Sequence, residues 1–183
     1  LRQSGLLTWI TPDPNRPEFD PAEFVRGRGT IYLLSKEGAG SARAITAAMT
    51  VAITRAAEQY AVTQPRGRLS VPLLCALDEA ANICRWPDLP NLYSHYGSRG
   101  IILVTFLQSW SQGAEVWGPD GMKKLWSAAN VRGIGRGLAE EGFLAELSKL
   151  IGDRDVLTRD VQTSRTGRST STRNRREAIL EVA

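Results

Sequence analysis

The sequence predicts a three-layer α/β fold with a mostly parallel sheet. Continuous apolar runs at Thr30–Ser35, Val71–Leu77 and Ile101–Leu107 alternate with segments whose apolar residues recur at helical spacing. Strands that alternate with helices along a chain favour βαβ units. Continuous apolar strands are typical of sheets that helices cover on both faces. The 183 residues are enough for one such core or for a part of one.

The remaining elements follow from local signals. Asp20 as N-cap and Pro21 at the first helical position predict a short helix. The stretch Gly38–Gly40 reads as a tight turn from the first strand into a long helix. Helices are expected at Ala42–Val62, Leu89–Tyr96, Pro119–Ala128 and Ala139–Ile151. A fourth strand is expected at Asn130–Gly135. We expect the domain to end near residue 157.

Composition narrows the function classes only a little. The net charge of +4 and the pI of about 9.4 permit a nucleic-acid partner without demanding one. The two cysteines, Cys75 and Cys84, form no CxxC pair, and the sequence has one histidine, so a structural zinc site is not expected. The low cysteine content favours a reducing compartment. No apolar stretch is long enough to span a bilayer, and the N-terminus has no signal-peptide pattern. We interpret the start at Leu1 as the start of a fragment.

Residues 158–183 differ in composition from the rest and are rich in Ser, Thr and Arg. This segment is either a solvated tail or an edge hairpin that turns back at Gly167. Its arginines could contact DNA phosphates or form an ordinary solvated face, and the sequence leaves both open. The residues concerned are Arg159, Arg165, Arg168, Arg173, Arg175 and Arg176.

The strongest chemical signal is the pair Asp78–Glu79 at the end of the second apolar run. Ligands of open α/β folds bind at the carboxyl ends of the strands. In a Walker B arrangement Asp78 holds Mg²⁺, usually through water, and Glu79 orients and deprotonates the attacking water. A capping carboxylate pair at a strand end would give the same sequence.

Two further polar residues are candidates for the same chemistry. Gln108 ends the third strand, where an amide could sense the γ-phosphate of a nucleotide, although it could equally cap the next helix. Arg99 precedes that strand and could stabilise charge on a phosphate across a subunit interface, or pair with a local carboxylate. Both readings of each residue stay open.

Four blocks in a fixed order resemble the TraG/TraD family of type IV coupling proteins. They are Leu77–Ile83, Pro87–Leu89, Ser98–Ile101 and Leu107–Ser109. The resemblance extends roughly from Phe19 to Arg176.

This resemblance implies a RecA-like, P-loop NTPase motor that works as a hexamer and uses ATP and Mg²⁺. Asp78 and Glu79 match the family's Walker B pair, and Gln108 matches its sensor glutamine, so that Asp78 and Gln108 would contact the nucleotide. Such proteins face the cytoplasm at the bacterial inner membrane, anchored through regions outside this chain. They pass DNA and its relaxase to a type IV secretion channel.

The phosphate-binding loop is the main departure from the family. The sequence contains no G-x-x-x-x-G-K-[ST], and Lys36 lies on the wrong side of Gly38 and Gly40. We therefore expect an incomplete domain that lacks the Walker A strand, and a fragment that alone neither binds ATP tightly nor hydrolyses it. Alternative functions are a non-catalytic docking module for relaxosome proteins, or part of an FtsK-type translocase or a helicase.

Overall fold

The computed structural model describes residues 10–35, 42–135, 140–164 and 167–179. The chain divides into two compact units, residues 1–134 and 135–183, and each is described by itself. The boundary expected near residue 157 lies inside a strand of the second unit.

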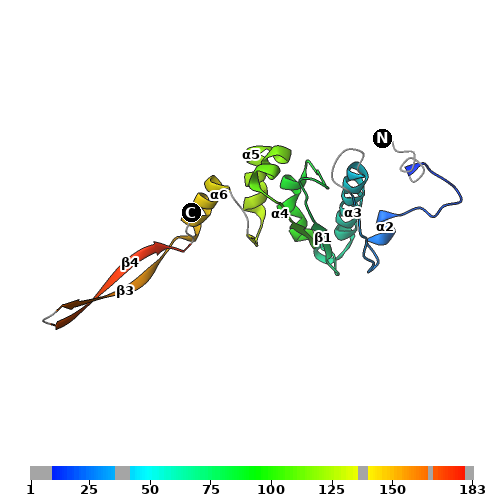
Figure 1. The fold of residues 1–183 in the computed structure, drawn as a ribbon. Helices are drawn as coiled ribbons and strands as arrows, with labels where there is room; N and C mark the ends of the chain where they lie inside the picture. Colours follow the sequence, from blue (N-terminus) through cyan, green and yellow to red (C-terminus); the bar gives the residue numbers. More distant parts are fainter. Residues whose placement is uncertain (1–9, 36–41, 136–139, 165–166, 180–183) are drawn as a thin grey trace. The chain divides into compact units, whose positions relative to one another are not determined.

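The first unit contains the helices and the small sheet that carry the candidate site (Figure 1). Its elements are α2 (Pro21–Phe24), α3 (Arg43–Thr63), the 3₁₀ turn η1 (Pro65–Gly67), β1 (Leu73–Leu77), α4 (Leu89–Arg99), β2 (Ile101–Thr105) and α5 (Trp110–Ala128). The second unit contains α6 (Glu141–Ile151), β3 (Asp153–Ser164) and β4 (Gly167–Ala178).

Strands β1 and β2 pair in parallel, with α4 as the crossover between them, as the sequence predicts. The register runs from Leu73↔Ile101 to Leu77↔Thr105. Helix α4 ends at Gly100, whose φ of 80° is a conformation that favours glycine. A Cβ there would also lie 3.3 Å from the backbone nitrogen of Leu69. Gly100 therefore lets α4 stop directly at the start of β2.

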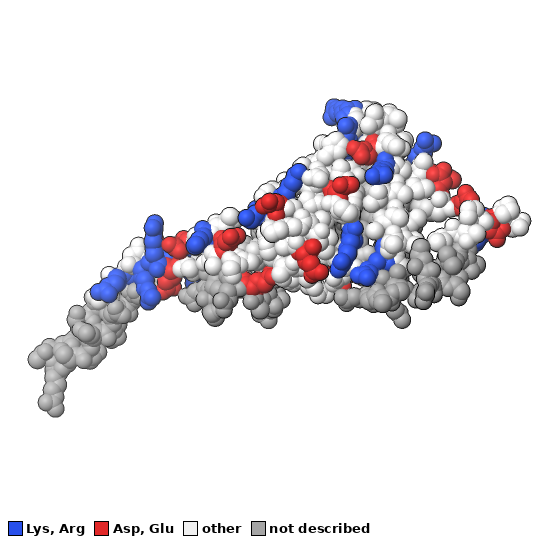
Figure 2. Space-filling view, turned by 90° about the horizontal axis from the view of Figure 1, so that it is seen from above, with Lys and Arg blue, Asp and Glu red and all other residues white. Residues whose placement is uncertain are grey.

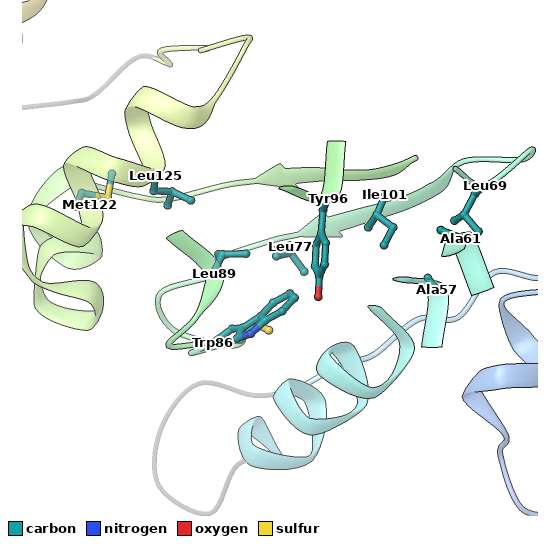
Figure 3. Close-up of a cluster of buried hydrophobic side chains, with 12 residues drawn as sticks. Ala57, Ala61, Leu69, Leu77, Trp86, Leu89, Tyr96, Ile101, Met122 and Leu125 are labelled. Carbon is teal, nitrogen blue, oxygen red and sulfur yellow. The ribbon is translucent and has the colours of Figure 1, made fainter. Parts of the chain in front are cut away.

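The core lies on one face of this two-stranded sheet. Leu77 and Ile101 point into it from the strands, and Trp86, Leu89 and Tyr96 join them from the crossover (Figure 3). Side chains of α3 and α5 complete the same cluster, among them Ala57, Ala61, Met122 and Leu125. Each of these residues is at least nine-tenths buried, so the helices and the sheet share one apolar core.

The opposite face of the sheet is apolar but open among the described residues. Leu74 is 63% exposed and Phe106 is 53% exposed, and Ile102 and Val104 on the same face are also exposed. Helices therefore cover one face of the described sheet. The α/β class is observed, while the third layer and the RecA-like completion of the sheet stay predictions.

Two predicted strands are wrong. Residues 31–35 and 130–135 form no strand, and Leu34 and Val131 are 87% and 88% exposed. A cavity of about 790 Å³ is lined in part by residues of the first segment and of β1. Apolar, β-branched composition is not sufficient because a strand also needs a hydrogen-bonded neighbour. The turn predicted at Gly38–Gly40 lies outside the described residues.

Several local predictions are confirmed. The Asp20 carboxylate accepts a hydrogen bond from the Ala22 N–H at 2.7 Å, which caps α2. The helix predicted over Pro119–Ala128 is present as the second half of α5, after a positive φ of 73° at Gly118.

None of the helices in the described ranges is long and apolar enough to cross a membrane.

The second unit is a helix followed by an antiparallel hairpin. Strands β3 and β4 pair along twelve residues each, from Asp153↔Ala178 to Ser164↔Gly167. Most of the side chains that are described in this hairpin are exposed. A two-stranded ribbon without a covering layer is marginally stable in water. At its base the Ile179 N–H donates to the Gly152 carbonyl at 3.1 Å.

We expect the half-buried Cys75 thiol to resist alkylation in the folded chain. Burial, and then the nearby Cys84 charge, raise the pKa of Cys75 from 9.0 to about 11. Because only the thiolate reacts, iodoacetamide labelling followed by peptide mass spectrometry should show slow reaction until the pH nears 11. The raised pKa also means that the thiol stabilises the fold fully below about pH 9, and that this contribution is lost as pH rises through 11.

The same chain in guanidinium chloride is the control, where labelling should follow the ordinary thiol pKa. Equal rates in the folded and unfolded chain at pH 8 would contradict the prediction.

Candidate functional site

The candidate site lies where β1 and β2 end at the same edge of the sheet. Parallel pairing extends beyond the strands, because the Phe106 N–H donates to the Leu77 carbonyl at 3.0 Å and the Ala80 N–H donates to the Phe106 carbonyl at 3.1 Å. The residues after β1 and those after β2 are thereby held side by side. Asp78, Glu79 and Gln108 come together here.

Glu79 has an unusual backbone conformation. Its φ is 47°, in the left-handed region that side chains other than glycine rarely adopt. The turn is held by its carbonyl, which accepts hydrogen bonds at 2.8 Å from the N–H groups of Asn82 and Ile83. Local strain of this kind persists only where the surrounding structure fixes it, and it gathers at functional sites.

The Glu79 turn directs its side chain toward Gln108. The Gln108 amide nitrogen donates to the Glu79 carboxylate, with 2.7 Å between Nε2 and Oε1. The sequence placed both residues at strand ends, but their contact across the sheet edge comes from the parallel register. A carboxylate and an amide this close can both bind one water, which donates to the carboxylate and accepts from the amide.

Asp78 stands beside this pair with an exposed side chain and, in the described part of the chain, no hydrogen bond or ion pair. The described residues contain no group of three or more His, Cys, Asp or Glu side chains that could hold a metal ion. Mg²⁺ needs no such cage, because it binds through one or two carboxylates together with waters and substrate phosphates. The carboxylate oxygens of Asp78 and Glu79 are donors of the kind that suits Mg²⁺.

A fourth polar residue, Gln112, belongs to the site and was missed from the sequence. Its Nε2 donates to the Oε1 atom of Gln108 at 3.3 Å. Ser109 caps α5 by accepting from the Gln112 N–H at 3.1 Å. The sequence Ser109-x-x-Gln112 matches the pattern of a capping box, and this signal could have directed attention to Gln112. The Gln112 side chain bonds Gln108 instead of the backbone of the cap.

Arg99 lies at the opposite end of the strands, before β2 begins. Its guanidinium donates to the Gly67 carbonyl at 3.1 Å, while Arg68 donates to the carbonyls of Gly97 and Ser98 at 2.7 and 3.2 Å. These two arginines tie the loop before β1 to the end of α4. The structure does not bring Arg99 to Asp78 within one chain, and a role at a neighbouring subunit's site stays a prediction.

The arginines of the hairpin are exposed and partly paired. Arg175 lies 3.8 Å from Glu177, and Arg176 lies 3.8 Å from Asp155 on the other strand. Figure 2 shows basic side chains over the described part of the hairpin with acidic ones beside them. Of the other predicted arginines, Arg159 and Arg168 are in the strands without described side chains, and Arg165 lies outside the described residues.

Comparison with known proteins decides the family. Residues 72–183, more than half of the chain, match the family model described as the TraM recognition site of TraD and TraG. The chain belongs to this family. It is the C-terminal part of a TraG/TraD-type coupling protein, and the match covers Asp78, Gln108 and both strands of the hairpin.

A solved structure supports the fold. The chain is similar to the bacterial conjugative coupling protein TrwBdeltaN70 in its unbound monoclinic form, with a TM-score of 0.50 and 18% identity. The similarity covers 75% of this chain and 30% of that one, so the TraG/TraD-type chain spans less than a third of its relative. A search of curated proteins gave no match.

Replacing Glu79 by glycine tests the strained turn of this coupling-protein fragment. Glycine adopts a positive φ without the cost of about 1–2 kcal/mol that an L-residue bears. We expect Glu79→Gly to leave the free energy of unfolding unchanged or to raise it by up to about 1 kcal/mol, as measured by urea denaturation.

Asp78→Gly is the matched control, since φ is not positive at Asp78. There glycine should destabilise by about 0.5–1 kcal/mol through chain entropy alone. Equal destabilisation by both variants would show that Glu79 carries no strain.

Proposed function

We propose that the chain is the C-terminal part of the RecA-like motor of a conjugative coupling protein, which uses ATP hydrolysis to drive DNA and relaxase into a type IV secretion channel. The observation that carries this proposal is the 2.7 Å contact between Glu79 and Gln108 beside the exposed Asp78. A capping pair at a strand end would have no need of a strained turn that aims one carboxylate at a neighbouring strand's glutamine.

Each residue has one role in this proposal. Asp78 holds Mg²⁺ through water, and the ion neutralises charge on the phosphates of ATP when it is bound. Glu79 orients the attacking water and accepts its proton. Gln108, within reach of the Glu79 carboxylate, reports the presence of the γ-phosphate to the start of α5.

The rest of the catalytic site must come from elsewhere. The sequence has no phosphate-binding loop, so we propose that other residues of a longer polypeptide supply it, and that the working form is a hexamer. In such an assembly Arg99 would act on a neighbouring subunit's nucleotide, and unchanged turnover of Arg99→Ala would argue against that role. We place this part on the cytoplasmic side of the bacterial inner membrane, with the anchor outside these residues.

The Glu79→Gln variant tests the motor directly, in the polypeptide that carries these residues together with a phosphate-binding loop. Glutamine keeps the shape of the side chain and removes the base. We expect ATP turnover to fall by about 10²-fold or more while nucleotide binding is retained, with and without single-stranded DNA. A coupled ATPase assay and a nucleotide-binding titration give the two readouts.

Glu58→Gln is the matched control, because Glu58 lies on α3 and bonds His95 at 2.8 Å rather than the site. If Glu79→Gln leaves ATP turnover unchanged, Asp78 and Glu79 have a structural role and no catalytic one.

A second function is favoured by the family description. The matched region, residues 72–183, includes the hairpin, and we propose that this unit docks a relaxosome protein of the TraM kind. Docking and DNA transport are compatible in one protein. The family match favours both over an FtsK-type translocase or a helicase.

The hairpin arginines provide a test of DNA contact. Each phosphate contact on single-stranded DNA contributes about 0.7 to the slope of log K against log salt. If Arg173, Arg175 and Arg176 bind phosphates, changing all three to Gln should lower the magnitude of that slope by about 2, as measured by fluorescence anisotropy.

A triple Gln variant at Arg26, Arg28 and Arg55, which lie in the first unit, changes the net charge equally and serves as control. If both triple variants give the same slope of log K against log salt, the hairpin arginines do not contact DNA, and protein docking is the function that remains for the hairpin.

A further inference from the structure

We propose that Gln112 is a positioning residue that fixes the orientation of the Gln108 side chain toward Glu79. The inference rests on the proposed function, because it assigns Gln112 a part in the nucleotide response of the same site. It adds the first turn of α5 to the machinery that Asp78, Glu79 and Gln108 form.

Three side chains form a continuous line of hydrogen bonds at the sheet edge. Gln112 Nε2 donates to Gln108 Oε1 at 3.3 Å, and Gln108 Nε2 donates to Glu79 Oε1 at 2.7 Å. The line begins on α5, crosses Gln108 in the loop after β2 and ends on Glu79 in the turn after β1. It therefore connects three different elements of the fold.

The direction of donation along this line follows from chemistry. An ionised carboxylate only accepts, so Gln108 must turn its NH₂ group toward Glu79. Its carbonyl oxygen then faces the other way, where it needs a donor. The Gln112 NH₂ group is that donor. If the Gln108 amide were flipped, its NH₂ group would face the NH₂ group of Gln112, and its oxygen would face the Glu79 carboxylate.

Helix geometry holds Gln112 where this contact is possible. Gln112 is the third residue of α5, four positions after Gln108, and its N–H is bound by the Ser109 cap at 3.1 Å. The next residue, Gly113, is buried, and a Cβ there would collide with Met122. The first turn of α5 is therefore packed closely, so it is a fixed platform for the Gln112 side chain.

If Gln112 only stabilised the start of α5, a different side chain would serve equally well at this position. In a capping box the third residue bonds the backbone N–H of the cap, and Glu serves as well as Gln. Glu also interacts favourably with the positive end of a helix. Gln112→Glu should therefore keep or improve α5 while it removes the donor to Gln108, which separates the two roles.

The test compares three variants in the polypeptide that contains the phosphate-binding loop. We expect Gln112→Glu and Gln112→Ala to lower kcat for ATP roughly 3- to 10-fold with KM unchanged, because one positioning hydrogen bond is lost. Gln112→Lys keeps a donor at this position and should restore most of the turnover. The unfolding midpoint of Gln112→Glu should equal or exceed that of the parent.

Glu79→Gln measured alongside distinguishes the possible failures. Loss of turnover in Glu79→Gln together with normal turnover in Gln112→Glu would overturn the positioning role and leave the motor intact. Normal turnover in Glu79→Gln would overturn the motor and this inference together. Should Gln112→Glu not fold, equal turnover of the Ala and Lys variants would overturn the proposal.

Discussion

The parallel pairing of β1 with β2 is the constraint on which the candidate site depends. It fixes Leu77 opposite Thr105, and the hydrogen bonds of Phe106 and Ala80 carry the same register past the strand ends. A shift of one residue would reverse which side chains face the core. It would also move Gln108 away from Glu79. Burial of Leu77 and Ile101 on one face makes such a shift costly, so the apolar core sets the geometry of the polar site.

The sequence predicted what local signals encode. Apolar runs located β1 and β2, Asp20 marked the start of a short helix, and Pro119 marked the start of the second half of α5. The strand-end positions of Asp78 and Gln108 then followed from the rule that parallel strands present their carboxyl ends together.

The sequence could not predict what depends on neighbours in space. Residues 31–35 and 130–135 have strand composition, but pairing is decided by which backbone lies alongside, and composition does not state that. The positive φ of Glu79 leaves no sequence mark either, because Glu is the wrong residue for it by every local rule. Gln112 was visible only as part of a capping pattern, since its second partner is the side chain of Gln108 and not the backbone.

The hydrogen bonds at the two ends of the sheet differ in exposure, and this difference suits the nucleotide response proposed for the site. At the end where the strands begin, Arg99 is partly buried and binds a backbone carbonyl, which favours a single rigid arrangement. At the end where they finish, the bonds that join Glu79, Gln108 and Gln112 are exposed. Exposed side-chain hydrogen bonds contribute little individually, because water replaces them readily. An arriving phosphate could therefore displace the Gln108 amide from Glu79 at small cost, whereas the rigid end keeps the strand register unchanged. A sensor built from strong, buried bonds would hold its geometry equally well but would not respond.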